Sequence, residues 1–291
     1  MTSFLASVAI FALVLTALVA TAEPVVTPRK EFVLAVTQDH QLIRFNAGQP
    51  QRVLVRRPLT GLPAGDELVG IDFRIARGVL YGLSRQGRLF TIDTASGRLI
   101  PVSDTPLAIA LPSGAVGFDF NPAADRIRVV GGGFNVRVHP DTGAVVDGDP
   151  AADGVQPDPR LSYDTGDPHA GQLPDIVAAG YTYNKNDDKL TTNYAIDRRR
   201  GTLVMQGSKE GLQPVVSPNT GRLRTVGPLG LGTLADASLD IADVSNIALA
   251  ALRGADGSAT RLFAVDLDSG RATLLGTVAD GAPLRGLAIE P

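Results

Sequence analysis

A four-strand pattern that recurs along the chain limits the folds open to it. The clearest copy, Val116 to Asp147, consists of short apolar or alternating runs separated by tight turns. Alternation every second residue is typical of β-strands, and this copy shows no helical period. Its turns carry glycine, which tolerates positive φ, and aspartate, which accepts hydrogen bonds from its own backbone. The pattern therefore predicts an all-β protein.

The first strand of the unit can be traced through five copies. In each copy, a small residue is followed by a hydrophobic residue, a small or acidic residue and a second hydrophobic residue. The copies begin at Gly70, Gly117, Gly180, Ser238 and Gly286. They lie 47 to 63 residues apart. A repeat of about 40 to 50 residues with four strands indicates a β-propeller, in which the longer intervals hold insertions.

The two ends of the chain predict how the ring closes. Leu284 to Ile289 resembles a first strand, whereas the segment that begins at Phe32 resembles a second strand. We therefore expect the last strand to complete the first blade, which would hide two sheet edges. The expected fold is an all-β β-propeller of four-stranded antiparallel blades, closed by the C-terminal strand. It has five blades, or six if the insertions hide another one.

The N-terminus has the features of a secretory signal peptide. Phe4 to Ala20 is an apolar stretch of 17 residues, and the A-T-A sequence at residues 20–22 fits a cleavage site. The alternative is an uncleaved membrane anchor, for which this stretch is at the short limit. We expect residues 1–22 to be the signal peptide and residues 23–291 to be a single propeller domain. The mature protein would be periplasmic or secreted, with no membrane association after cleavage.

The composition excludes several kinds of site. The chain has no cysteine, so disulfides, thiolate zinc sites and cysteine nucleophiles are ruled out. Its formal net charge of −3 provides no basic stripe, so no nucleic-acid partner is expected. His40, His139 and His169 fall in different repeats without metal-ligand spacing, and no G-x-S-x-G motif is present. The sequence therefore identifies no catalytic group, no metal ligand and no resident cofactor.

Three aspartates occupy one position of the repeat. Asp72, Asp119 and Asp240 are each the third residue of a first strand, so they would approach the axis from three blades. Such a ring could bind a cation, and Ca²⁺ would suit its oxygen ligands. Alternatively, each carboxylate accepts backbone N–H groups and ties one blade to the next. We prefer the second interpretation, because a residue repeated with the fold usually has a structural role.

Arginines form the other candidate cluster. Arg128 and Arg137 lie in alternating strands of one unit and could project together toward a carboxylate or phosphate of a ligand. The preferred alternative is that they form ion pairs with Asp119, Asp125 or Asp141. The candidate ligand-binding residues are therefore the three repeated aspartates together with Arg128 and Arg137. The partner would be a small molecule or a protein of unknown identity.

Several segments resemble a family of exported bacterial proteins. They are VGFDFNPAADRIRVVGGGFNVRVHPDTGAVVDGD, VAAGYTYN, TTNYAID, SPNTGRLRTVGPLG and ELVGIDFRIARGVLYGL. Together they cover most of the expected domain, and the family is catalogued as domain of unknown function 4394. The resemblance implies a propeller-like protein that is periplasmic or secreted. It brings no established activity and no assigned catalytic residues.

Two functions are consistent with these observations. The first is an exported β-propeller that acts as a ligand-binding, partner-binding or scaffold module. The alternative is a periplasmic or secreted hydrolase or lyase with a site in the central channel, acting with or without a metal. An enzyme predicts a polar channel with several convergent ionisable groups, whereas a scaffold predicts a channel filled by small residues.

Overall fold

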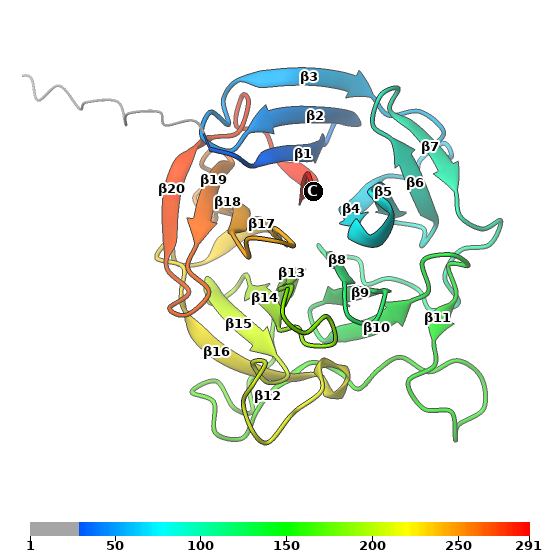
Figure 1. Cartoon of the computed structure of the whole chain (residues 1–291), viewed down its shortest axis with the longest axis vertical. Coiled ribbons are helices and arrows are strands. Elements are labelled where there is room, and N and C mark those ends of the chain that lie inside the picture. Colours follow the sequence, from blue (N-terminus) through cyan, green and yellow to red (C-terminus); the bar gives the residue numbers. More distant parts are fainter. Residues whose placement is uncertain (1–28) are drawn as a thin grey trace, which may run out of the picture.

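The fold is a ring of β-sheets around a central axis, as Figure 1 shows. The computed structural model describes residues 29–291, which form strands β1 to β21 and two short 3₁₀ turns, η1 (Ile75–Arg77) and η2 (Pro218–Thr220). The strands are arranged in five sheets, which are the blades of a propeller. The five-bladed, all-β propeller predicted from the repeat is therefore confirmed.

Blades are numbered by their order around the ring, and strands are given from the axis outward. The first blade consists of β21 (Leu284–Ile289), β1 (Phe32–Thr37), β2 (Gln41–Asn46) and β3 (Val53–Pro58). The second consists of β4 (Leu68–Arg74), β5 (Val79–Ser84), β6 (Leu89–Asp93) and β7 (Arg98–Pro101). The third consists of β8 (Gly117–Asn121), β9 (Arg126–Gly131), β10 (Phe134–Val138) and β11 (Val145–Val146).

The fourth blade carries an additional outer strand. It consists of β13 (Ile176–Tyr181), β14 (Asn193–Asp197), β15 (Thr202–Gln206), β16 (Arg222–Pro228) and β12 (Ser162–Tyr163). The fifth consists of β17 (Leu234–Ile241), β18 (Ala248–Gly254), β19 (Arg261–Val265) and β20 (Ala272–Thr277). Neighbouring strands are antiparallel, except that β12 pairs in parallel with β16. The insertion before β13 therefore covers the edge of an existing blade and does not hide a sixth.

The C-terminal strand closes the ring. β21 pairs antiparallel with β1, and Ala288 lies opposite Leu34. The backbone N–H of Glu290 donates to the carbonyl of Phe32 at 2.9 Å, and the Glu290 carboxylate forms a two-pronged ion pair with Arg44. The predicted closure is confirmed, because the first blade is built from both ends of the described chain.

The hydrophobic core lies between neighbouring blades. Five buried apolar clusters are present among residues 29–291. Four are shared by two adjacent blades, and the fifth belongs mainly to the fourth blade. The cluster between the second and third blades, for example, packs Leu83 against Phe118 and Val136. Removal of this apolar surface from water, at about 25 cal/mol per Å², holds the blades together.

No helix within residues 29–291 combines the length and apolar character needed to cross a membrane. The expected signal peptide, residues 1–22, lies outside the described residues. Cleavage and export therefore stay predictions.

Candidate functional site

The central channel is filled by the inner strands. One small residue from each inner strand lines the axis: Gly70, Gly117, Ala178, Ser238 and Gly286. A Cβ atom on Gly117 would lie 2.5 Å from the backbone nitrogen of Ala179, so the next blade packs directly against this glycine. The cavity that remains has a volume of about 20 Å³, which is room for little more than one water. The channel matches the expectation for a scaffold and has no space for a substrate.

The structure corrects the register of the third copy of the repeat. Phe120 N–H donates to Asp72 Oδ2 at 2.7 Å, and Tyr181 N–H donates to Asp119 Oδ2 at 2.9 Å. Tyr181 therefore occupies the place of Phe120, and Gly180 takes the place of the aspartate. The expected start of this copy at Gly180 is wrong by two residues, because a shift of two residues preserves the alternation of a strand.

Asp72 and Asp119 tie consecutive blades together. Asp72 accepts the N–H of Phe73, in its own strand, and the N–H of Phe120, in the next blade, both at 2.7 Å. Asp119 accepts the N–H of Tyr181, again in the next blade. Each of these hydrogen bonds satisfies a buried backbone N–H group that would otherwise lack a partner. The carboxylates therefore join the second, third and fourth blades near the axis.

Asp240 makes the same connection between the fifth blade and the closing strand. It accepts the N–H of Ile241, in its own strand, at 2.6 Å and the N–H of Ile289, in the first blade, at 2.5 Å. The aspartate of one blade normally accepts the inward N–H group of the next blade. Gly180 and Ala288 stand at this position in two blades and have no side-chain acceptor, so the aspartate of the blade that follows accepts the N–H group of its own strand. Three carboxylates thus pair with five inward backbone N–H groups, one per blade.

Burial raises the pKa of these three carboxyl groups. The pKa of Asp72 and that of Asp119 are raised by burial first and then by the neighbouring carboxylates. Burial also raises the pKa of Asp240 to about 7 and that of Asp243, in the β17–β18 turn, to about 6. Sequence reasoning missed Asp243, because it has no counterpart in the other repeats. The three repeated carboxylates each place an oxygen within 4.8 Å of the others.

The hydrogen bonds support the blade-tying interpretation over a Ca²⁺ site. Among residues 29–291, only Oδ1 of Asp119 receives no hydrogen bond within the three carboxylates. A cation would have to bind carboxylate oxygens that already accept backbone N–H groups. These N–H groups already offset the negative charge of an ionised carboxylate, so no cation is needed for that purpose. The ring of aspartates is therefore best understood as part of the structure of the propeller.

Arg128 is buried at the inner wall between the third and fourth blades and is 1% exposed. Its Nη1 donates to Asp158 Oδ2 at 2.7 Å and to Asn135 Oδ1 at 2.9 Å. Its Nε donates to the hydroxyl of Tyr181, and its Nη2 donates to Asn219 Oδ1. Each nitrogen of the guanidinium donates to a protein acceptor, so Arg128 positions the side chains around it.

The ion-pair partner expected for these arginines is different in the structure. Arg137 donates through Nε and Nη2 to Asp158, the carboxylate that also holds Arg128. Asp119 lies in the axial ring, whereas Asp125 and Asp141 both pair with Arg74. The prediction of ion pairs with those three aspartates is therefore wrong. The insertion after β11 brings Asp158 inward, and spacing along the repeat gives no indication of that contact.

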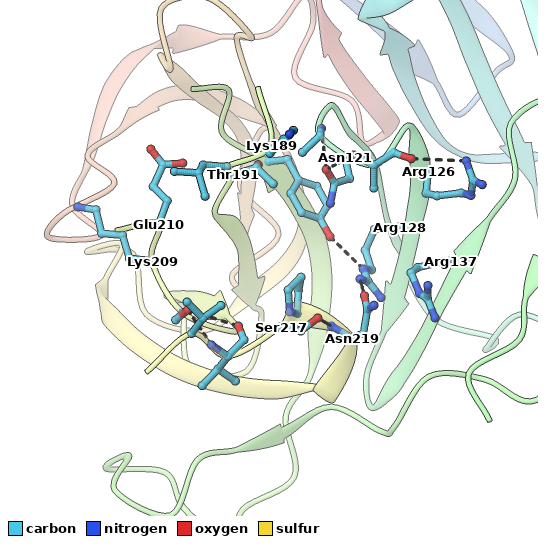
Figure 2. Close-up of a pocket in the computed structure, with 18 of the residues that line it drawn as sticks. Asn121, Arg126, Arg128, Arg137, Lys189, Thr191, Lys209, Glu210, Ser217 and Asn219 are labelled. Carbon is cyan, nitrogen blue, oxygen red and sulfur yellow. Dashed lines mark hydrogen bonds between the residues drawn. The ribbon is translucent and has the colours of Figure 1, made fainter. Parts of the chain in front are cut away.

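A pocket of about 410 Å³ opens beside these arginines, between the third and fourth blades (Figure 2). Its walls come from strands β9 and β10, the β8–β9 turn, the β13–β14 loop and the β15–β16 loop. The three connections lie on one face of the ring, because the strands of a blade alternate in direction. We call this hollow the interblade pocket. Its volume is typical of small-molecule sites.

Cationic groups dominate the charged lining of the interblade pocket. Among residues 29–291, one carboxylate, that of Glu210, and five cations line it: Arg126, Arg128, Arg137, Lys189 and Lys209. Asp158 compensates only one of the two charges of Arg128 and Arg137, and Lys209 pairs with Asp268 at 2.5 Å. The pocket therefore carries an excess of positive charge. Leu190 and Val215 add apolar surface to its rim.

A second hollow, of about 750 Å³, lies between the fourth and fifth blades. Its charged lining residues are Arg261, Arg271 and Asp256. None of its lining residues within the described chain is a buried polar side chain, whereas the interblade pocket has Arg128. The interblade pocket is therefore the better candidate, because its polar groups are held in place.

The three histidines are not brought together. His40 adopts positive φ in the β1–β2 turn, and Nδ1 of His139 accepts the backbone N–H of Asp141. His169 packs edge-on against the ring of Tyr163. Sequence reasoning did not place the loops of the interblade pocket together, because they come from two different blades and their meeting depends on how those blades pack.

Two solved structures were found in a structural comparison, each with a TM-score under 0.5. A chain of the nidogen/laminin complex is 13% identical, over 90% of this chain and 98% of that chain, with a TM-score of 0.48. A structural genomics protein of unknown function from Bacteroides thetaiotaomicron is 13% identical, over 79% of this chain and 58% of that chain, with a TM-score of 0.47. Comparison with curated proteins gave no match.

The family resemblance seen in the sequence is confirmed. A family model matches residues 41–288, which cover the second to fifth blades and the first blade without strand β1 and the last residue of β21. The chain therefore belongs to the family described as Domain of unknown function (DUF4394).

Proposed function

We propose that this protein is an exported β-propeller that binds a small-molecule ligand in the interblade pocket. One contrast carries the proposal: the interblade pocket measures about 410 Å³, whereas the axial cavity measures about 20 Å³. Ligands of a propeller need a concave site with fixed polar groups. Here Arg128 holds such groups in place from a fully buried position.

The arrangement favours a binding module over a hydrolase or lyase acting in the channel. The axial aspartates face backbone N–H groups, and the small residues next to them leave no room for a substrate. The described lining of the interblade pocket contains no histidine and one carboxylate, Glu210. General acid–base chemistry needs a proton-transferring pair positioned at one reacting atom. Binding is therefore the activity that these residues support.

A fragment screen tests the binding site. Methyl resonances of Leu190 and Val216, which line the pocket, should shift with at least one class of small molecule in an NMR titration. Ala124→Trp would fill the pocket from the exposed β8–β9 turn and should abolish those shifts. Ala95→Trp makes the same change on an exposed turn outside the pocket and should leave them intact. Ligand shifts that survive Ala124→Trp, or no shifts with any compound, would overturn the proposal.

Export is proposed from the sequence alone. The apolar stretch and A-T-A site at residues 20–22 favour cleavage before Glu23. Intact-mass measurement of the protein in the soluble periplasmic or medium fraction should give a chain that begins near Glu23. Full-length chain held in the membrane fraction would show that the N-terminus is an anchor.

A further inference from the structure

Arg128 decides which hydrogen-bonding groups the interblade pocket offers. Its guanidinium can only donate, and it donates to Tyr181 Oη at 3.1 Å and to Asn219 Oδ1 at 2.5 Å. The Asn219 amide must therefore direct its oxygen toward Arg128 and keep its NH₂ group for another partner. In the same way, the Tyr181 oxygen accepts from Arg128 and keeps its hydroxyl hydrogen. Both side chains thus present donors to the pocket that they line.

Two further side chains present donors to the same wall. Ser217 Oγ accepts the backbone N–H of Asn219 at 3.2 Å, which leaves the serine hydroxyl hydrogen. Arg137 uses Nε and Nη2 for Asp158, which leaves Nη1. Within residues 29–291, no protein acceptor pairs with the remaining hydrogens of these four side chains. The wall formed by Tyr181, Arg137, Ser217 and Asn219 is therefore a set of donors without acceptors.

The charge of the pocket matches these donors. Asp158 is shared by the buried Arg128 and the partly exposed Arg137, so one positive charge of this group is uncompensated. The lining carboxylate, Glu210, lies across the pocket from both arginines in Figure 2 and accepts from Asn184 at 3.4 Å. Donors backed by net positive charge bind oxyanions, because charge-assisted hydrogen bonds are about twice as strong as neutral ones.

The rim of the pocket is apolar. Leu190 is 40% exposed and Val215 is 71% exposed, and both belong to loops that line the pocket. Exposed apolar side chains beside a polar site commonly contact the apolar part of a ligand. A ligand that joins an oxyanion to an apolar body would satisfy both halves of this pocket.

We propose that the interblade pocket binds a small amphipathic oxyanion, a carboxylate or a phosphate monoester with an apolar chain. Tyr181, Arg137, Ser217 and Asn219 hold the anionic group, and Leu190 and Val215 contact the chain. Arg128 is a positioning residue that sets the polarity of the wall. The inference rests on the proposed function and names the class of ligand.

Calorimetric titration with matched probes tests the class of ligand. Octanoate and octyl phosphate should bind at one site at least tenfold more tightly than octyltrimethylammonium or octanol. Inorganic phosphate should compete with octyl phosphate more weakly, since it lacks the chain. The tighter of the two anionic probes identifies the acid group, and either result supports the proposal. Equal or tighter binding of the cation or the alcohol would overturn it.

Variants separate the anion wall from the rest of the surface. Arg137→Gln removes one donor and one charge and should weaken the anionic probes about tenfold, while Asp158 keeps Arg128 as its partner. Val215→Asp, at an exposed position, should weaken them as well. Arg222→Gln removes the same charge from the outer strand of the fourth blade and should have no effect. Unchanged affinity in Arg137→Gln and Val215→Asp would contradict the proposal.

The two proposals fail in different ways. Compounds that bind in the interblade pocket without preference for an anion would sink only the inference about the ligand class. The absence of any ligand in that pocket, while the protein remains folded, would sink the proposed function as well.

Discussion

The Asp72 carboxylate of the second blade accepts the backbone N–H of Phe120 in the third blade at 2.7 Å. Asp119 and Asp240 repeat this contact with Tyr181 and Ile289. The innermost strands of a propeller turn their backbones toward each other, so their N–H groups have no partner in their own sheet. A carboxylate at this position satisfies the N–H of the next blade, since an unsatisfied buried donor would cost about 1–3 kcal/mol.

The two kinds of axial carboxylate should respond differently to asparagine. Each carboxylate oxygen of Asp72 accepts one backbone N–H group. In Asp72→Asn, the amide NH₂ group would replace one of these oxygens and face an N–H donor. This substitution should lower the free energy of unfolding by about 1–3 kcal/mol. Asp119 accepts only Tyr181, so Asp119→Asn keeps its acceptor and should cost less. Urea denaturation of the two variants measures the difference.

Thermal denaturation with and without added calcium tests the alternative, in which the three aspartates bind a cation. If the aspartates serve the structure, calcium should leave the melting temperature of the parent unchanged. A calcium-induced rise in melting temperature that disappears in both Asp72→Asn and Asp119→Asn would show that the ring binds a cation, because a ligand of the folded state stabilises it by mass action.

Asp158 should be far more important for stability than its position in a long loop suggests. Its side chain and that of Arg128 are each 1% exposed. Asp158→Ala would leave a buried guanidinium without its counter-ion, which typically costs about 3–5 kcal/mol. Asp141→Ala is the matched control, since Arg74 keeps Asp125. Denaturation should show a large loss for the first variant only, and equal losses would contradict this account of Arg128.

The repeat made the architecture predictable, and the reasons lie in particular residues. Gly70, Gly117 and Gly286 mark the innermost strand, where a side chain would clash with the next blade, and aspartate follows two of them at the same offset. Ring closure was predictable because the two ends of the chain each carry an incomplete unit. The third copy was misaligned because Gly180 falls where three other blades have aspartate, and Tyr181–Thr182 repeats the pattern two residues late.

The candidate site was only half predictable. Arg128 and Arg137 were identified because they face the same way in paired strands. Their partner could not be identified, since the insertion that supplies Asp158 contains several other aspartates and has no repeat to align. Asn219 and Leu190 belong to loops whose position depends on how the fourth blade packs against the third. Such contacts are set by tertiary structure, and periodicity along the chain carries no record of them.

Loss of the closing strand should disrupt the ring. Deletion of residues 284–291 removes the partner of β1, the acceptor pairing of Asp240 with Ile289 and the apolar contacts of Leu287. We expect insoluble or strongly destabilised protein, because two sheet edges and an apolar face become exposed. Deletion of Pro291 alone should have no effect. Unchanged melting temperature and solubility after the larger deletion would show that β21 is dispensable for closure.

The pH dependence of stability should reveal the raised pKa of Asp240. Burial raises this pKa to about 7 in the folded protein, whereas the unfolded chain titrates near the ordinary value of 3.8. Between these values the folded state binds more protons than the unfolded state. The contribution of Asp240 to stability is therefore complete below the unfolded pKa and is lost as the pH rises toward 7.

Other carboxylates act in the opposite direction, because ion pairs and hydrogen bonds lower their pKa values, as the guanidinium of Arg74 does for Asp141. The clean measurement is therefore the difference in unfolding free energy between the parent protein and Asp240→Asn at several pH values. The asparagine side chain has one oxygen fewer to accept a backbone N–H group, and this cost is the same at every pH. Only the parent protein can bind a proton at this site, so the pH-dependent part of the difference comes from Asp240. The deficit of the variant should be largest below the unfolded pKa of 3.8 and should shrink by up to about 1.4 kcal/mol per pH unit from there toward pH 7. A deficit that grows with pH would contradict this account, because it would mean that the pKa of Asp240 is lowered in the folded protein and that its carboxylate is ionised there.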